Sequence, residues 1–244
     1  MASDWRRSAL PIRVLRRGRP ERLKGVDGTM TATERAYSEI KRRIMDMTLA
    51  PNEHVLEAEL AQDLGVSRTP IREAVLMLRS DGLVDIVPRR GVRIRPVSAD
   101  QLEGIYDVLA LLEARAAELA ATRQSSARIA ALDSAVASMS SALRERDLDG
   151  WEGADDDFHR LLVEASENDY LVAAARTSVD RVRRARRMTM RLRPLPTESV
   201  RDHAELVALI RAGRAADAFA SHLAHRRRAA ELLVTLLREN RLVV

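Results

Sequence analysis

The sequence predicts a mainly α-helical protein in which an N-terminal winged helix-turn-helix precedes a C-terminal all-α helical bundle. Aromatic residues make up only 3% of the 244 residues, and Ala, Leu, Arg and Glu are abundant, which favours helices over sheets. Apolar residues recur every three or four positions in the N-terminal part and again from Ser98 to the end. Two short β-like runs, 83–87 and 92–96, separate these regions and are joined by a Pro-Arg-Arg-Gly turn.

The first 29 residues differ in composition from the rest of the chain. They contain eight basic residues against three acidic ones, and proline and glycine interrupt any period. We expect residues 1–29 to be a disordered basic arm, or to lie upstream of a true start at Met30. Alternatively, this arm adds contacts to nucleic-acid phosphates.

Residues 30–97 form the predicted winged helix-turn-helix. A first helix spans 31–48, and the turn at 49–53 contains a proline that disfavours helix in the residue before it. A second helix carries a stripe of three leucines and stops at Gly65, and a third spans about 67–81.

The third helix has the pattern of a DNA recognition helix. Arg68 and Arg72 are four residues apart and point outward together, with Thr69 beside them, and the opposite face is apolar. Arginine bonds guanine edges or phosphate, and helix N-termini favour phosphate. The alternative is that both arginines only solvate the helix. We expect Glu73 to support Arg72 or Arg68 rather than to read a base.

Residues 98–244 form the predicted bundle, because their apolar residues keep a helical period with no strand-like alternation. The expected helices span 102–122, 126–146, 148–167, 168–193, 197–212 with Thr197 or Ser199 as the cap, and 214–239.

A candidate metal site lies within this bundle. Asp155 and His159 are four residues apart on one helix, and His203 and His225 lie on two later helices. Imidazole with carboxylate suits Zn²⁺, Ni²⁺, Mn²⁺ or Fe²⁺. The alternatives are that His159 is a core histidine and that the aspartates at 155–157 form a solvated face.

The charge and composition restrict the setting of the protein. A net charge of +5 indicates an anionic partner. The absence of cysteine excludes disulfides and thiolate metal sites and fits a reducing cytoplasm. No apolar run reaches the ~20 residues of a membrane helix, and the N-terminus lacks a signal-peptide core. We expect a cytoplasmic protein that is nucleoid-associated when bound to DNA and has no membrane partner.

The region from about 34 to 97 resembles the DNA-binding domain of GntR-type bacterial transcription regulators. This resemblance implies that Arg68, Thr69 and Arg72 contact DNA from the recognition helix. It implies that Arg89, Arg90 and Gly91 bring the wing to the neighbouring groove or backbone. The matching segments are LAP at 49–51, LEAELA at 56–61, LGVSRTPIREA at 64–74, Leu78, DGLV at 81–84 and RRG at 89–91.

Residues 98–240 resemble the ligand-binding FCD domain of FadR-type regulators. In metal-containing members an aspartate, a histidine four residues later and two further histidines bind the ion, which implies Asp155, His159, His203 and His225 here. His222 competes with His225, but the distance from the preceding glycine favours His225. The matching residues are Leu112, Glu113, Ala116, Ala117, Leu119, Ala120, Ala121, Asp155, Phe158, His159, Asn168, His203, Gly213, Ala218 and His225.

The chain departs from this family at one position. Members that bind carboxylates often have an arginine four residues before the matching glutamate, where this chain has Leu109. We expect one or two arginines of the run between 181 and 193 to face the cavity and supply the missing charge.

These features predict a homodimeric transcriptional regulator that binds operator DNA and is not an enzyme. Repression is the commoner mode in the family that the chain resembles. A small effector, expected to be a carboxylate, would bind beside a divalent metal ion in the bundle. One alternative is a metal sensor, in which the ion itself is the signal. Another is a metal-dependent hydrolase fused to a DNA-binding domain, with Asp156 or Asp157 as the general base.

Overall fold

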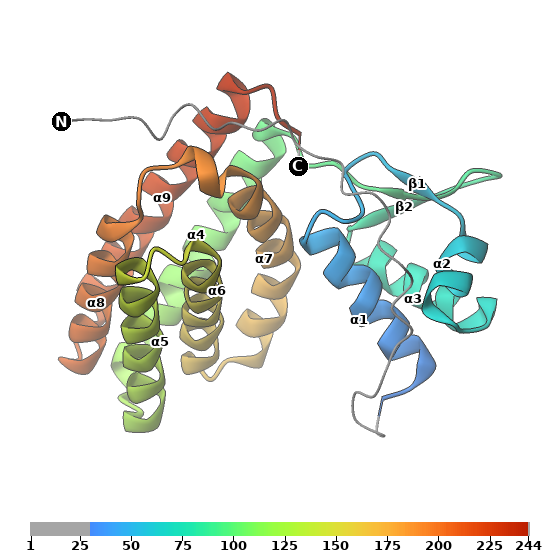
Figure 1. Ribbon diagram of the computed structural model, residues 1–244. Helices are drawn as coiled ribbons and strands as arrows, with labels where there is room; N and C mark the ends of the chain where they lie inside the picture. The colour runs from blue at the N-terminus through green and yellow to red at the C-terminus, as the bar shows by residue number, and fades with distance from the viewer. Residues whose placement is uncertain (1–29, 244) are drawn as a thin grey trace.

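The computed structural model describes residues 30–243, so the predicted basic arm at 1–29 lies outside the described residues. A small winged-helix domain lies beside a larger helical bundle (Figure 1). This arrangement confirms the predicted fold class. No helix of the described part is long and apolar enough to cross a membrane.

The winged-helix domain contains three helices and a three-stranded antiparallel sheet with the strand order β1-β3-β2. The sequence did not predict β1, because two residues are too few to show alternation. The elements are α1 (Ala32–Met45), β1 (His54–Val55), α2 (Glu57–Leu64), α3 (Arg68–Ser80), β2 (Val84–Val87) and β3 (Gly91–Ile94).

Local chemistry defines the ends of these helices. Thr31 and Glu34 form a reciprocal capping box at the start of α1. Gly65 ends α2 with φ +66°, a left-handed conformation that glycine adopts without steric cost. Ser67 is the N-cap residue of α3, although its side chain accepts no capping hydrogen bond there.

The bundle contains six α-helices and one 3-10 turn in the described residues. The predicted fourth helix is interrupted after Thr189, where the chain tightens into the 3-10 turn. The elements are α4 (Ala99–Arg123), α5 (Ser126–Arg144), α6 (Leu148–Ala165), α7 (Asp169–Thr189), η2 (Met190–Leu192), α8 (Thr197–Arg211) and α9 (Ala215–Glu239).

The start of α8 corrects a prediction. Pro196 is the N-cap residue, and neither Thr197 nor Ser199 caps the helix with its side chain. The Thr197 amide donates to the carbonyl oxygen of Leu195 at 2.9 Å, so the backbone turn already satisfies it.

Helix α4 organises the bundle. It packs most extensively along α9 and also contacts α6, α7 and α8. Helix α7 lies on the side of the bundle that faces α1 (Figure 1). The polar centre described below lies where α4, α6, α8 and α9 meet, and α7 separates it from the winged-helix domain.

Candidate nucleic-acid interface and metal centre

Helix α3 exposes the predicted DNA-contacting residues at its N-terminal end. Arg68, Thr69 and Arg72 are exposed, whereas the opposite face of the helix is fully buried in the domain core. Within residues 30–243 neither arginine forms an ion pair. Two unpaired guanidinium groups at a helix N-terminus are suited to phosphate and to base edges in a major groove.

Glu73 does not have the predicted role. Its carboxylate accepts a 2.6 Å hydrogen bond from the hydroxyl of Thr33, at the start of α1. The prediction that Glu73 supports Arg68 or Arg72 is therefore wrong, because α1 packs against α3 and offers a nearer donor.

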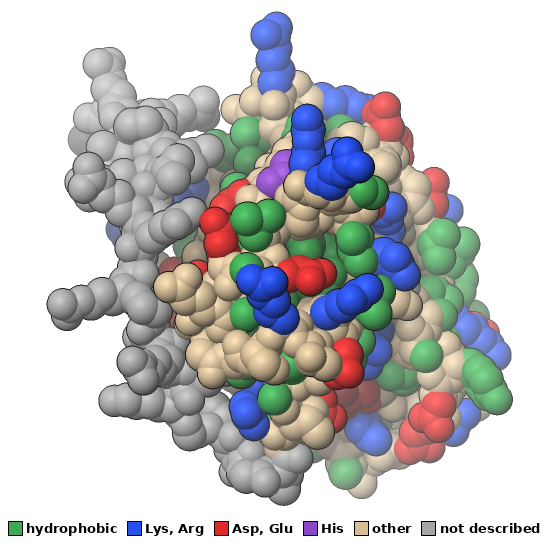
Figure 2. Space-filling model, turned by 90° about the vertical axis from the view of Figure 1, so that its right-hand side faces the viewer, with side chains coloured by type: hydrophobic (Ala, Val, Ile, Leu, Met, Phe, Trp, Pro, Cys, Tyr) green, Lys and Arg blue, Asp and Glu red, His purple; other side chains and the backbone are tan. Residues whose placement is uncertain are grey.

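The wing presents two further arginines. Arg89 and Arg90 are exposed in the turn between β2 and β3, and Arg89 has a φ of +62°. Gly91 has a structural reason to be glycine, since an added Cβ would lie 2.5 Å from the carbonyl oxygen of Val55 in β1. Basic side chains are prominent on the side of the molecule formed by this domain (Figure 2).

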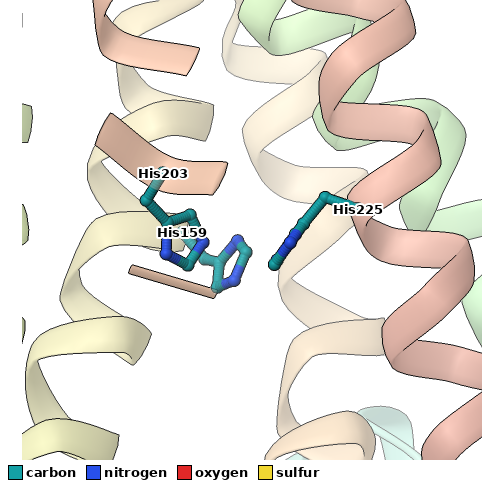
Figure 3. A group of neighbouring side chains, drawn as sticks. All are labelled: His159, His203 and His225. Carbon is teal, nitrogen blue, oxygen red and sulfur yellow. The ribbon is translucent and has the colours of Figure 1, made fainter. Parts of the chain in front are cut away.

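Three of the predicted metal ligands converge inside the bundle. His159 of α6, His203 of α8 and His225 of α9 point toward one another (Figure 3). One ring nitrogen of each lies within 4.8 Å of the others, and all three residues are buried.

Asp155, the fourth predicted ligand, lies at the edge of this triad. Its carboxylate oxygens lie 3.7 Å from His159 Nε2 and 3.7 Å from His203 Nδ1. The same carboxylate accepts a close hydrogen bond from Arg186 of α7. The structure therefore brings all four predicted residues together. Arg186 would compete with a metal ion for the carboxylate of Asp155.

Two carboxylates orient the triad from outside. His225 Nδ1 hydrogen-bonds to Asp202 at 2.9 Å, and His159 Nδ1 lies 3.0 Å from Glu113 Oε2. This arrangement directs the Nε2 atoms of His159 and His225 to the centre, as is usual where a carboxylate holds a metal-binding histidine. In this structure Arg226 Nη1 lies 3.3 Å from His159 Nε2.

His203 carries the strongest indication that the site takes a ligand. It is 1% exposed, and neither ring nitrogen has a hydrogen-bond partner among the described residues. Buried polar atoms are normally paired, so an orphaned imidazole needs an explanation. Burial, with the charges of neighbouring histidines, holds the pKa of His203 well below its usual range. The ring is neutral at pH 7, which is the form that binds metal.

Glu113 is a buried carboxylate beside the histidines. Burial alone would raise the pKa of Glu113, but the charges of Arg226 and His159 hold that pKa well below its usual range. Glu113 thus remains a carboxylate at neutral pH. A set of imidazoles and carboxylates fits a borderline divalent cation such as Zn²⁺, Ni²⁺, Mn²⁺ or Fe²⁺.

His222 occupies a different position from His225. Its Nε2 lies 2.9 Å from Glu113 Oε2, and burial lowers its pKa to about 4. Glu113, His159 and His222 form a second group of possible ligand atoms, but Arg226 Nε lies 3.1 Å from the shared Glu113 carboxylate. That positive charge disfavours a cation beside Glu113. The choice of His225 over His222 stays a prediction.

Sequence reasoning missed part of this centre. Asp202 and Arg226 were not singled out, although each directly adjoins a predicted histidine ligand in the chain. Leu109, where the resembling family often has arginine, is fully buried in the bundle core. Arg186 is the member of the arginine run that reaches the centre, as expected for one or two of them.

The two aspartates considered as general bases are both engaged by arginines. Asp156 pairs with Arg183 and Arg186, and Asp157 pairs with Arg160 on the surface of α6. Neither carboxylate is placed to activate a water molecule at the histidine centre.

Comparison with known proteins covers both domains. The sequence family of FCD domains matches residues 104–228. The family of bacterial regulatory proteins called gntR matches residues 32–94. The Nta operon transcriptional regulator of Aminobacter aminovorans is 31% identical over 194 residues, which cover 77% of this chain and 88% of that protein.

Two further proteins are similar to this chain in sequence or in fold. The HTH-type transcriptional repressor RspR of Escherichia coli (strain K12) is 27% identical over 158 residues, covering 64% of this chain and 69% of that one. The solved structure of E. coli McbR/YncC matches with a TM-score of 0.75 at 19% identity, covering 85% of this chain and 99% of that chain. The named relatives are transcription regulators and not enzymes.

Proposed function

This chain belongs to the gntR family of bacterial regulatory proteins and carries an FCD domain, and from that premise we propose that it is a repressor controlled by a small carboxylate bound beside a divalent metal ion. The single observation that carries the metal proposal is the buried His159–His203–His225 triad with both nitrogens of His203 unpartnered. Repression is favoured because RspR, which is 27% identical over 64% of this chain, is named a transcriptional repressor.

The proposed metal ligands are Asp155, His159, His203 and His225. Glu113 and Asp202 hold two of the rings in the orientation that directs Nε2 inward. When bound, the ion supplies a coordination position for an effector oxygen. Asp155 can join this set only by giving up part of its contact with Arg186.

The proposed partner of a carboxylate effector, in place of the arginine that is missing at position 109, is Arg226, whose guanidinium also contacts Glu113 at 3.1 Å. A cavity of about 240 Å³ lies between α4 and α9, lined in part by Tyr106 and Arg226. Arg226 is buried, stacks 4.9 Å from the centroid of the Tyr106 ring, and contacts His159 on its other side. We assign to Arg226 the role of pairing with the carboxylate, because it joins this cavity to the histidine centre.

Operator recognition requires two copies of the chain in this proposal. A recognition helix that enters a major groove reads a few base pairs, and paired copies read two half-sites spaced by about one helical turn, roughly 34 Å. The wing arginines Arg89 and Arg90 add contacts to the flanking backbone or groove.

The outer face of α4 is the proposed contact between the two copies. Val108 and Leu111 are one helical turn apart and 55% and 51% exposed. We expect Val108→Asp to weaken self-association by about tenfold or more, because a carboxylate would be buried against an apolar face. Sedimentation equilibrium measures the effect. Leu195→Asp, which alters a 59% exposed leucine before α8, is the matched control. Equal dimerisation of both variants would place the interface elsewhere.

A binding experiment tests the proposed function as a whole. Genomic duplexes retained by the full-length protein are sequenced, and affinity for the recovered duplex is measured with Zn²⁺-loaded and with chelated protein. Small mono-, di- and tricarboxylates are then added to each form. We expect about a tenfold affinity change on adding a matching carboxylate to the metal-loaded form alone. A response to Zn²⁺ with no response to any carboxylate would identify a metal sensor instead.

A further inference from the structure

Helix α7 presents opposite faces to the histidine centre and to the DNA-binding domain. Asp180 and Arg184 are four residues apart and share one face, whereas Arg186 lies about 200° from Arg184 around the helix axis. Asp180 and Arg184 contact the winged-helix domain and its linker, and Arg186 points into the bundle. In Figure 1, α7 lies between the rest of the bundle and α1.

On the bundle side, α7 is held by charge. Arg186 is 5% exposed and pairs with Asp155 and Asp156 of α6. Burial alone would lower the pKa of Arg186, but these two carboxylates raise it above its usual value. A buried guanidinium that loses part of this compensation is strongly disfavoured. Any new partner of Asp155 therefore changes the position that Arg186 prefers.

On the opposite side, three successive contacts lead from α7 to the recognition helix. Asp180 pairs with Lys41 of α1 at 2.6 Å. The Lys41 ammonium lies 3.4 Å from the hydroxyl oxygen of Tyr37, and that hydroxyl donates to Asp81 at 2.5 Å. Asp81 is the C-cap residue of α3. A displacement of Asp180 thus acts on the helix that carries Arg68.

Arg184 adds a second contact, at the domain linker. Its side chain is fully buried and donates to the carbonyl oxygen of Arg95 at 2.9 Å. Nε and Nη2 have no hydrogen-bond partner within the described residues, and burial lowers the pKa of Arg184 to about 10. A buried cation held by one carbonyl group is poorly compensated, so this contact has little net stability to lose.

We propose that α7 transmits the state of the histidine centre to the DNA-binding domain. As Asp155 turns from Arg186 toward a cation in the centre, α7 shifts. The Asp180–Lys41 pair and the Arg184–Arg95 contact change with it. The inference rests on the proposed function, because it requires Asp155 to act as a metal ligand. It adds the route by which the occupancy of the centre alters the recognition helix.

Hydrogen–deuterium exchange of the full-length protein, with Zn²⁺ or with EDTA, tests this route. We expect Zn²⁺ to change exchange by about fivefold both at 155–159 and in α1 of the wild type. In Asp180→Asn the change at 155–159 persists and the change in α1 is lost. Asp180→Glu restores it. The matched control is Asp133→Asn, which breaks an exposed ion pair with Arg211 between two helices of the bundle. This variant should behave as wild type. Lys41→Gln breaks the same interdomain pair should Asp180→Asn fail to fold.

The outcomes separate this inference from the proposed function. If wild-type protein binds Zn²⁺ and α1 does not respond, the route through α7 is wrong and the metal centre stands. If α1 responds equally in Asp180→Asn and in Lys41→Gln, the Asp180–Lys41 pair does not carry the signal and that part of the route is wrong. If wild-type protein binds no Zn²⁺ by atomic absorption, the metal centre and the route are both wrong.

Discussion

Arg68→Ala and Arg72→Ala are each expected to weaken specific operator binding by about fivefold to 150-fold, corresponding to the roughly 1–3 kcal/mol of a bidentate base contact. Both side chains are exposed at the N-terminal end of α3, and neither forms an ion pair within the described residues. Their full charge is therefore available to DNA. Fluorescence anisotropy with the recovered operator duplex and with a scrambled duplex, at one fixed salt concentration, measures the loss.

Arg79→Ala is the matched control for this experiment. Arg79 is exposed in the last turn of the same helix. The variant therefore removes an equal charge, but from the C-terminal end of α3, whereas Arg68 lies at the N-terminal end. Its affinity should change by no more than about threefold, and equally for both duplexes. Thermal unfolding checks that all three variants remain folded. Wild-type operator affinity in Arg68→Ala and Arg72→Ala would contradict the assignment of α3 as the reading helix.

Most of the helical architecture could be predicted from local sequence, because each helix buries a long apolar stripe. The stripe of α3 and the glycine at position 65 are recognisable without any knowledge of the tertiary structure. The strand β1 could not be predicted, since it exists only through pairing with β3. The cap at Pro196 was also missed, because a backbone turn there replaces the side-chain bond that sequence patterns record.

The four candidate metal ligands can be named from the sequence, whereas the residues that surround them cannot. Four residues of metal-binding type on three helices can be found by type and by the family resemblance. The carboxylates that orient them are determined by packing between helices far apart in sequence. Glu113 lies on α4 and meets His159 of α6, and Arg186 reaches Asp155 from α7. No local period reports such contacts, so the sequence predicts only that one or two arginines between 181 and 193 face the cavity, and it identifies neither Arg186 nor its partner.

Relative to wild type, His203→Leu should raise the melting temperature of the metal-free protein and lower that of the Zn²⁺-loaded protein. The orphaned nitrogens of His203 cost free energy in the metal-free fold, about 1–3 kcal/mol for an unsatisfied buried polar group. Leucine removes these nitrogens and places an apolar side chain beside Phe158, whose ring centroid lies 4.2 Å from that of His203. The chelated variant should therefore melt at a higher temperature than chelated wild type. In excess Zn²⁺ the order reverses, because wild type gains about 4 kcal/mol at a thousandfold excess over Kd and the variant gains little.

His222→Gln separates the two histidines that compete on α9. His222 bonds to Glu113, whereas His225 turns Nδ1 to Asp202 and leaves Nε2 for the centre. His222→Gln should retain one Zn²⁺ per chain with at most about a hundredfold weaker affinity, the range seen when an outer hydrogen-bonding partner is altered. His225→Gln should lose the ion, as His203→Leu does. Atomic absorption after gel filtration gives the stoichiometry. Retention of Zn²⁺ by His225→Gln and its loss by His222→Gln would move the site to the group formed by Glu113, His159 and His222.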